Sequence, residues 1–96
     1  MKIRILKSAL EDLVAARGFY DQQQAGVGSY FFASLFSEID SLAINAGIHP
    51  IRLGYHRLLA RRFPYAVYYR LSGSEVLVYR VLDCRRDPNW IRRALR

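Results

Sequence analysis

The side chains best suited to binding or chemistry in this 96-residue chain are its arginines. Eleven of the thirteen fall in residues 49–96, where three carboxylates oppose them and the formal charge is +8, while residues 1–48 carry −1. A guanidinium offers planar, bidentate contacts to phosphate and carboxylate groups, which a lysine ammonium does not. The C-terminal half is therefore predicted to bind a polyanion or an acidic protein segment, unless its arginines serve only to keep the surface solvated.

Aromatic residues stand between these arginines, and the combination suits a surface that contacts phosphates and stacks on bases. The aromatic residues concerned are Tyr55, Tyr65, Tyr68, Tyr69, Tyr79 and Trp90. Tyrosine in a strand usually packs its ring in the core and keeps its hydroxyl at the rim, so the same pattern also fits plain core packing.

Familiar catalytic and metal-binding sets are missing from the chain. Neither His49 nor His56 has metal-ligand spacing around it, no glycine-rich phosphate loop is present, and a single Cys84 cannot form an internal disulfide or a thiolate metal site. We therefore expect no metal and no cofactor. His56 beside Arg57 could carry a proton during nucleic-acid cleavage, although a polar surface role is the simpler interpretation.

No run of residues approaches the roughly 18 apolar positions of a membrane span. The N-terminus is charged and is followed by no long apolar stretch. With one cysteine and no disulfide framework, the sequence predicts a soluble, cytoplasmic protein without a membrane partner.

The first half of the chain predicts a strand followed by two helices. Residues 2–6 alternate apolar and polar types, as in a short strand. The sequence Ser8-Ala9-Leu10-Glu11 matches a capping box and predicts a helix over residues 8–23. Apolar residues then recur at spacings of three and four over residues 32–46, which predicts a second helix that Gly47 terminates. Two helices joined by a few residues form an antiparallel hairpin.

Beyond Pro50 the apolar period changes from 3.6 to 2. Asp87-Pro88 has the form of an N-cap followed by proline at the first helical position, which predicts a short terminal helix. Three β-rich segments precede it, at residues 55–63, 65–71 and 75–82.

These elements predict a single α+β domain over residues 1–96. It comprises an N-terminal strand, a helical hairpin, a three-stranded antiparallel meander and a short C-terminal helix. The hairpin is expected on one face of a single antiparallel-type sheet, because each amphipathic layer needs an apolar partner.

The turn between the last two strands decides where Arg80 points. If the turn holds the three residues 72–74, Arg80 pairs with Ala66 and projects from the same face as Arg70 and Tyr68. If it holds two residues, Arg80 joins the opposite face, against the helices. We favour the three-residue turn, because burying an unpaired Arg80 against the helix pair would be costly.

Two segments resemble the ParE/RelE toxin superfamily of type II toxin–antitoxin modules. They are Phe63-Pro64-Tyr65-Ala66-Val67-Tyr68-Tyr69-Arg70 and Val81-Leu82-Asp83-Cys84-Arg85-Arg86-Asp87-Pro88-Asn89-Trp90. Gly54-Tyr55-His56-Arg57 is similar to the strand that introduces the meander in that family. The resemblance covers essentially the whole chain, and the ParE branch looks closest.

The resemblance implies a small basic toxin that poisons the cell when it is freed from a cognate antitoxin protein. The antitoxin's partly disordered C-terminal segment wraps the toxin in this superfamily, and we expect that segment over the helix pair and the sheet edge. ParE-like members inhibit DNA gyrase, whereas RelE-like members cleave mRNA on the ribosome. Gyrase inhibition is the leading expectation, and ribosome-dependent mRNA cleavage is the alternative.

Departures from the RelE pattern favour the ParE interpretation. RelE-like cleavage, as the resemblance implies, uses lysines in the second strand, an arginine at the start of the third, an arginine just after the fourth and a C-terminal tyrosine. This chain has no lysine in the second strand, and Tyr65 stands where the third-strand arginine would be. Arg86 alone matches, and Trp90 stands near the position of the tyrosine. These losses remove most of the groups that would activate a 2′-hydroxyl and stabilise the transition state.

The candidate site residues follow from these arguments. The expected target or effector surface consists of Arg85, Arg86, Trp90, Arg70 and Arg80. The expected basic patch beside it consists of Arg57, Arg61 and Arg62. No catalytic residue is expected in a gyrase-binding toxin, and the catalytic set of a ribonuclease would be His56, Arg57 and Arg86.

Overall fold

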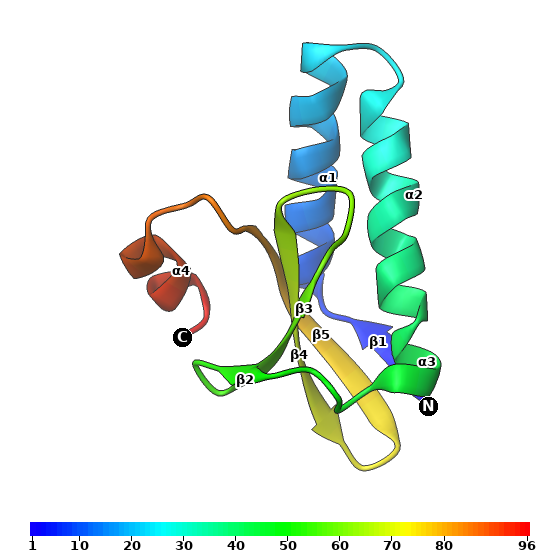
Figure 1. Ribbon diagram of the computed structural model, residues 1–96, viewed down its shortest axis with the longest axis vertical. Helices are drawn as coiled ribbons and strands as arrows, with labels where there is room; N and C mark the ends of the chain where they lie inside the picture. Colours follow the sequence, from blue (N-terminus) through cyan, green and yellow to red (C-terminus); the bar gives the residue numbers. More distant parts are fainter.

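Five strands form one sheet in the order β1-β5-β4-β3-β2 in a computed structural model that describes residues 1–96 (Figure 1). The elements in chain order are β1 (Lys2–Ile5), α1 (Lys7–Gln23), α2 (Val27–Asp40), α3 (Leu42–Asn45), β2 (Ile51–Arg52), β3 (Tyr55–Leu59), β4 (Tyr65–Ser72), β5 (Glu75–Asp83) and α4 (Pro88–Ala94). The expected α+β fold is confirmed. The second helix, predicted as continuous to Gly47, is divided at Ser41 into α2 and the short α3, and the short strand β2 was not predicted.

The two long helices form the expected antiparallel hairpin, which rises beyond the sheet (Figure 1). Gly26 begins α2 from the left-handed region, with φ of 90°. Asp21 of α1 accepts a hydrogen bond from the Gly28 amide at 2.8 Å and so caps α2 from the neighbouring helix. A Cβ on Gly28 would lie 2.5 Å from Cγ of Asp21, so only glycine fits where the hairpin closes.

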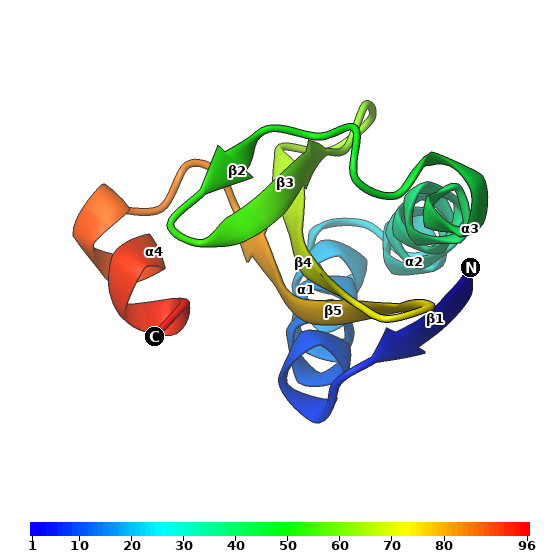
Figure 2. The ribbon, with the colours of Figure 1, turned by 90° about the horizontal axis from the view of Figure 1, so that it is seen from below.

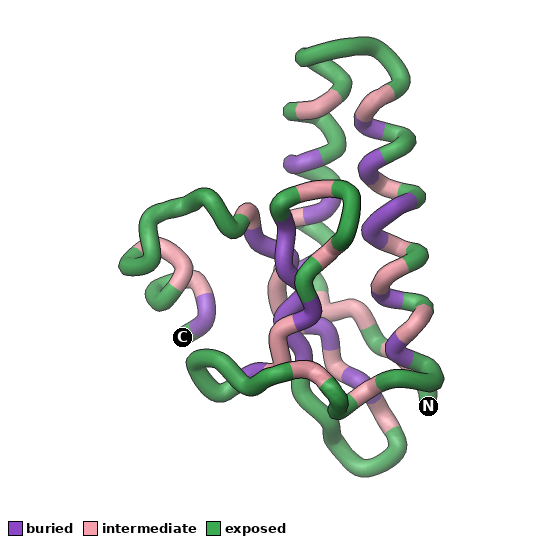
Figure 3. Tube along the Cα trace, viewed as in Figure 1, coloured by how far each residue is buried: buried purple, intermediate pink, exposed green.

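The sheet lies between two helical layers. The hairpin covers one face, and α4 covers the other (Figure 2). The larger core joins the hairpin to the sheet around Phe31, Leu35, Val67 and Tyr69, all fully buried. Buried residues line the inner sides of the hairpin and the central strands, while its tip is exposed (Figure 3).

A smaller core joins the opposite face of the sheet to α4. Its buried members are Tyr55, Ala66, Tyr68, Leu82 and Leu95, with Trp90 and Ile91 packed against them. The Tyr55 hydroxyl donates a hydrogen bond to the Leu95 carbonyl at 2.9 Å and fastens the C-terminal end of the chain. Asp87 accepts from the Asn89 amide and Pro88 follows it, so the predicted helix start is confirmed.

The sheet is mixed, which corrects the antiparallel arrangement predicted for it. The strands β2 to β5 pair antiparallel, but β1 pairs parallel with β5, Ile3 lying opposite Val76. A parallel pair needs a long connection, and the helical hairpin between β1 and the meander supplies it. The period of the N-terminal strand could not reveal which strand it would join.

The turn between β4 and β5 holds two residues, so the three-residue turn predicted for it is wrong. Ser72 pairs with Glu75, and Gly73 between them has φ of 59°, the glycine position of a type II′ turn. A β-bulge then shifts the register, because Tyr69 pairs with Val78 while Tyr68 pairs with Arg80. The extra residue returns Arg80 to the face of Tyr68, so the predicted face is correct although the predicted register is not.

The predicted capping box is also wrong. The helix begins two residues earlier, with Leu6 in place of Ser8 at its N-cap and no side-chain cap. Ser8 therefore lies inside the first turn, and its hydroxyl donates to the Tyr79 carbonyl at 2.8 Å. Tyr79 is the residue at the β5 bulge, so the serine satisfies a backbone acceptor that the irregular pairing leaves free.

Candidate functional site

The connection from β5 to α4 brings together three of the predicted effector residues. Arg85 makes a bidentate contact with the Asp83 carboxylate, through Nε at 3.0 Å and Nη2 at 2.8 Å. Arg86 lies over the Trp90 ring, its guanidinium carbon 3.8 Å from the centroid. The side chain of Arg85 is 61% exposed, so this segment presents two ordered guanidiniums at the surface.

The pairing of Asp83 and Arg85 fixes their charges. The Arg85 guanidinium holds the pKa of Asp83 below its usual value, and Asp83 in turn raises the pKa of Arg85. The carboxylate also accepts from the Arg85 amide at 2.8 Å, which closes a tight turn. Arg86, which contacts the Trp90 ring and no carboxylate, keeps the charge that can meet an acidic or phosphate group.

A groove of about 370 Å³ lies beside this connection. One wall belongs to α1, and the other belongs to the second half of β5 and to the start of α4. The lining residues are Asp12, Ala15, Ala16, Phe19, Tyr65, Arg80, Val81, Leu82, Asp83, Arg86 and Trp90. The groove therefore has an apolar floor with arginines and carboxylates at its rim.

The floor of this groove includes an open strand edge. The parallel partner β1 pairs with β5 only from Glu75 to Val78. Beyond that point the Val81 amide donates to Asp12 Oδ2 at 3.0 Å, which shows that Val81 turns its backbone away from β4. By the alternation of a strand, the Val81 carbonyl and the Asp83 amide face the groove as well. Sequence reasoning missed this edge, because nothing in the strand pattern says where β1 stops.

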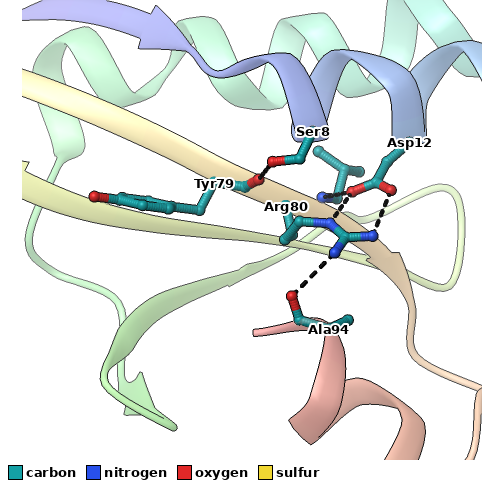
Figure 4. Close-up of polar contacts among 6 residues, drawn as sticks. Ser8, Asp12, Tyr79, Arg80 and Ala94 are labelled. Atoms are coloured by element: carbon teal, nitrogen blue, oxygen red, sulfur yellow. Dashed lines mark hydrogen bonds and ion pairs between the residues drawn. The ribbon is translucent and has the colours of Figure 1, made fainter. Parts of the chain in front are cut away.

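Arg80 forms an internal clamp at the same place (Figure 4). Its Nε and Nη2 donate to the two carboxylate oxygens of Asp12 at 2.7 and 2.9 Å, and its Nη1 donates to the Ala94 carbonyl at 3.0 Å. Asp12 raises the pKa of Arg80, and the side chain is 25% exposed. This predicted effector residue thus joins α1, β5 and α4, and few of its donors remain for a partner.

Arg70 is likewise committed to contacts within the chain. It lies 4.0 Å from the Tyr55 ring centroid and 5.4 Å from that of Tyr79, and its Nε donates to the Gly54 carbonyl at 3.0 Å. It shares a sheet face with Arg80 but stands near the β2–β3 turn, whereas Arg86 lies at the other end of the meander. The structure therefore does not bring Arg70 to the β5–α4 connection.

Arg57 stands on the α4 side of the sheet without a carboxylate partner. It pairs in register with Tyr68, and its charge acts on the Tyr68 hydroxyl and the Cys84 thiol. Burial raises the pKa of Tyr68, and Arg57 opposes that rise. The Nε of Arg57 is buried and has no hydrogen-bond acceptor. A buried guanidinium nitrogen without an acceptor is uncommon in folded proteins, and this one is closed off from solvent.

The expected basic patch divides into two parts. Arg61 lies in the β3–β4 loop, where its amide donates to Glu38 of α2 at 2.8 Å and its side chain is 86% exposed. Arg62 beside it is exposed and forms no ion pair. Arg57 turns instead to Tyr68, so its guanidinium and that of Arg61 have different neighbours.

His56 is on the other face of the sheet from Arg57. Its ring stacks on Tyr69 at 5.0 Å, and its Nδ1 donates to the His49 carbonyl at 2.8 Å. Adjacent strand residues point to opposite faces, so the structure does not assemble His56 with Arg57 and Arg86. The three residues of the conditional ribonuclease set are therefore not in one site.

No group of three or more histidine, cysteine, aspartate or glutamate side chains is placed to hold a metal ion. No helix is long and apolar enough to cross a membrane.

Comparison with protein families identifies the chain. The profile of the ParE toxin of the type II toxin–antitoxin system parDE matches residues 3–88. The chain belongs to the ParE toxin family. It is thus the toxin component of a type II toxin–antitoxin system, as the resemblance of its strand and arginine segments implied.

A solved structure shares the ParE fold. The chromosomal ParDE system from P. aeruginosa matches with a TM-score of 0.76 at 20% sequence identity, over 84% of this chain and 92% of that one. At this identity the match supports the fold. Comparison with curated proteins by sequence found no match.

Proposed function

We propose that this ParE-family toxin inhibits DNA gyrase by binding it and carries out no reaction of its own. Membership of the ParE family carries the proposal. Two structural observations support it: Arg85, Arg86 and Trp90 form an ordered, exposed basic surface, and the conditional ribonuclease residues are divided between two sheet faces. A gyrase target would also place the protein in the cytoplasm.

A supercoiling assay tests this proposal. Purified toxin is expected to inhibit gyrase at low stoichiometry and to induce an SOS response on expression. Arg86→Ala and Trp90→Ala should weaken inhibition about tenfold or more, because arginine and tryptophan anchors carry much of the energy of protein interfaces. Arg4→Ala, which removes an exposed arginine on β1, is the matched control. Full supercoiling at saturating toxin would contradict the proposal.

A second candidate activity, mRNA cleavage on the ribosome, draws on Arg57. Arg57 lies on the same side of the sheet as α4 and has no carboxylate partner, and its buried Nε would have to become exposed before a phosphate could accept from it. Toeprinting on translating ribosomes would then show cuts in the A site that disappear in Arg57→Ala and Arg86→Ala. Intact mRNA together with inhibited gyrase would exclude cleavage and leave gyrase binding as the only mechanism.

We place the antitoxin segment in the groove between α1 and β5. The Val81 carbonyl and the Asp83 amide would pair with one added strand, since sheet edges bind extended segments through main-chain hydrogen bonds. The apolar floor near Phe19 suits an apolar anchor, and Arg86 at the rim suits an acidic side chain. This is the kind of segment that the family's antitoxins would supply.

Phe19 and Tyr30 give a matched test of this placement. They are 49% and 52% exposed aromatic residues on the two helices of the hairpin, and only Phe19 lines the groove. Phe19→Ala should weaken binding of the antitoxin by about tenfold or more, whereas Tyr30→Ala should leave it nearly unchanged. Isothermal titration with the purified antitoxin makes the comparison. Equal losses in the two variants would place the antitoxin elsewhere.

A further inference from the structure

The solvent face of α1 carries an apolar stripe that nothing in the chain covers. Leu10 is 44% exposed and Val14 57% exposed, although both are large apolar residues in the N-terminal half of a 17-residue helix. The buried residues of α1, which are Ala9, Leu13 and Ala16, face the opposite way. A shallow depression of about 450 Å³ follows the stripe and is lined by Lys7, Leu10, Glu11, Val14 and Ala15.

This face is self-complementary in charge. Residues spaced three and four apart share a helix face, so Lys7, Leu10, Val14, Gly18 and Asp21 form one row. The row begins with a cation, ends with an anion and has Val14 at its centre. In an antiparallel pair of such helices, residues equally far before and after Val14 stand level with each other.

A two-fold axis beside Val14 gives a consistent set of contacts. It places Val14 against Val14 of a second copy and puts Lys7 level with Asp21 of that copy, once at each end. Leu10 stands level with Gly18 of the second copy. Apart from Gly18 itself, its two chain neighbours and the backbone of its own helix, no atom lies within 4 Å of a Cβ built on Gly18, so the helix surface there is open for close approach. A parallel pair would instead set Lys7 against Lys7.

We infer that two copies of this chain pair antiparallel through the solvent faces of their α1 helices. A symmetric homodimer of this type has an isologous interface, in which the same patch serves both partners. Asp21 already caps Gly28 through Oδ1, which leaves its other carboxylate oxygen for the lysine. The contact involves one helix from each copy and is smaller than the roughly 1,200 Å² of a standard stable interface, so the dimer is weak.

Sedimentation equilibrium on the purified toxin, over about 10 to 500 µM at low salt, tests the dimer. A monomer–dimer equilibrium is expected, with an apparent mass that rises with concentration. Val14→Asp should abolish it, because two carboxylates would meet on the two-fold axis. Lys7→Glu should raise the dissociation constant about tenfold, since each end would then oppose two anions. Ala33→Asp, on the exposed face of α2, is the matched control and should leave the equilibrium unchanged.

Cross-linking gives a second test that does not depend on affinity. In a Cys84→Ser background, Val14→Cys should form an intermolecular disulfide on mild oxidation, because facing helix residues on the axis come within disulfide range. Ala33→Cys in the same background should remain largely uncross-linked. A purely monomeric wild-type protein, or equal cross-linking at both positions, would overturn the inference. Both tests use the toxin alone, so their failure would leave the gyrase and antitoxin proposals untouched.

Discussion

Leu53 holds a backbone conformation that disfavours its side chain. It is the only residue other than glycine with positive φ, at 56°, and it precedes Gly54 at 84°. Arg52 pairs with Tyr55, so Leu53 and Gly54 between them form a two-residue turn of type I′. This turn strongly prefers asparagine followed by glycine. The Gly54 carbonyl accepts a hydrogen bond from Arg70, so the strained backbone of Leu53 lies next to the contact that orients this arginine.

Replacing Leu53 with asparagine is expected to stabilise the fold. Asparagine tolerates the left-handed region, and Leu53 is 50% exposed, so little apolar burial is lost. The free energy of unfolding should rise by about 1 kcal/mol in urea denaturation. Leu53→Ala keeps a Cβ and gains no preference for this turn, so its free energy of unfolding should not rise in the same way. A loss of stability in Leu53→Asn would mean that the contacts of the leucine side chain stabilise the fold by more than its backbone strain destabilises it.

His49 makes stability depend on pH near neutrality. The Gly47 amide donates to the Tyr69 hydroxyl at 2.9 Å, which leaves the hydroxyl proton to be donated to His49 Nδ1. Tyr69 is fully buried, so a protonated Nδ1 would leave its hydroxyl proton without an acceptor. Burial lowers the pKa of His49, the charge of His56 adds to that effect, and Glu38 opposes it.

The sign of the pH effect follows from that lowered pKa. The folded state binds a proton on His49 less readily than the unfolded state, so the stabilisation is present above the unfolded pKa of about 6.5 and declines as the pH falls below it. The free energy of unfolding should therefore decrease between about pH 7 and pH 5. His49→Asn keeps an acceptor for Tyr69 and removes the titration, so its profile should be flatter. Parallel profiles for the two proteins would count against His49.

At the scale of elements, Asp12 connects three parts of the chain. Its carboxylate accepts from Arg80 and from the Val81 amide, and Arg80 reaches on to the Ala94 carbonyl (Figure 4). The side chains of Asp12 and Arg80 are 15% and 25% exposed, so the pair is only partly screened by water. Tyr55 holds Leu95 from the other side, and α4 is thereby fixed by two hydrogen bonds as well as by its apolar residues.

Removing the Asp12 carboxylate should destabilise the fold and loosen the packing of α4 against the sheet. Asp12→Ala leaves the Arg80 charge and the Val81 amide without their partner, and should cost about 2–3 kcal/mol of unfolding free energy. Asp12→Asn keeps an acceptor for one donor and should cost about half of that. Hydrogen exchange should show the α4 amides opening faster in both variants. If α4 exchange is unchanged while stability falls, the clamp acts on α1 and β5 alone.

For the whole molecule, the charge asymmetry predicts how partner binding responds to salt. Apart from the half-buried Arg57, the arginines outside internal ion pairs are exposed, including Arg86 and the Arg92, Arg93 and Arg96 of the C-terminal end. Contacts between exposed charges are screened over about 8–10 Å at ordinary ionic strength. The affinity for an acidic antitoxin segment should therefore fall about tenfold as salt rises from about 0.05 to 0.5 M, mainly through slower association.

Surface plasmon resonance at several salt concentrations checks that expectation. A matched pair of variants separates the two sources of affinity. Arg86→Ala should reduce the salt dependence, whereas Phe19→Ala should lower the affinity by a similar factor at every salt concentration. Binding that does not respond to salt would mean that apolar contacts alone hold the antitoxin.

The amino-acid sequence by itself determined the main helices and strands, the fold class and the family. Apolar periods of 3.6 and 2 located α1, α2 and the meander, and Asp87-Pro88 located α4, because these signals act within a few residues. The resemblance carried by residues 63–70 and 81–90 predicted the ParE family, which the profile match confirmed. The grouping of Arg85, Arg86 and Trp90 was also within reach, since they are neighbours along the chain.

Only the tertiary structure decided which arginines are free and which are structural. Arg80 looked like a surface residue until the bulge in β5 and Asp12, 68 positions away, engaged its guanidinium. His56 and Arg57 looked like one site until the strand turned them to opposite faces. Register, bulges and the open edge of β5 depend on pairing between distant segments, and one residue of slip exchanges the two faces of a strand. Short-range patterns contain no record of that pairing.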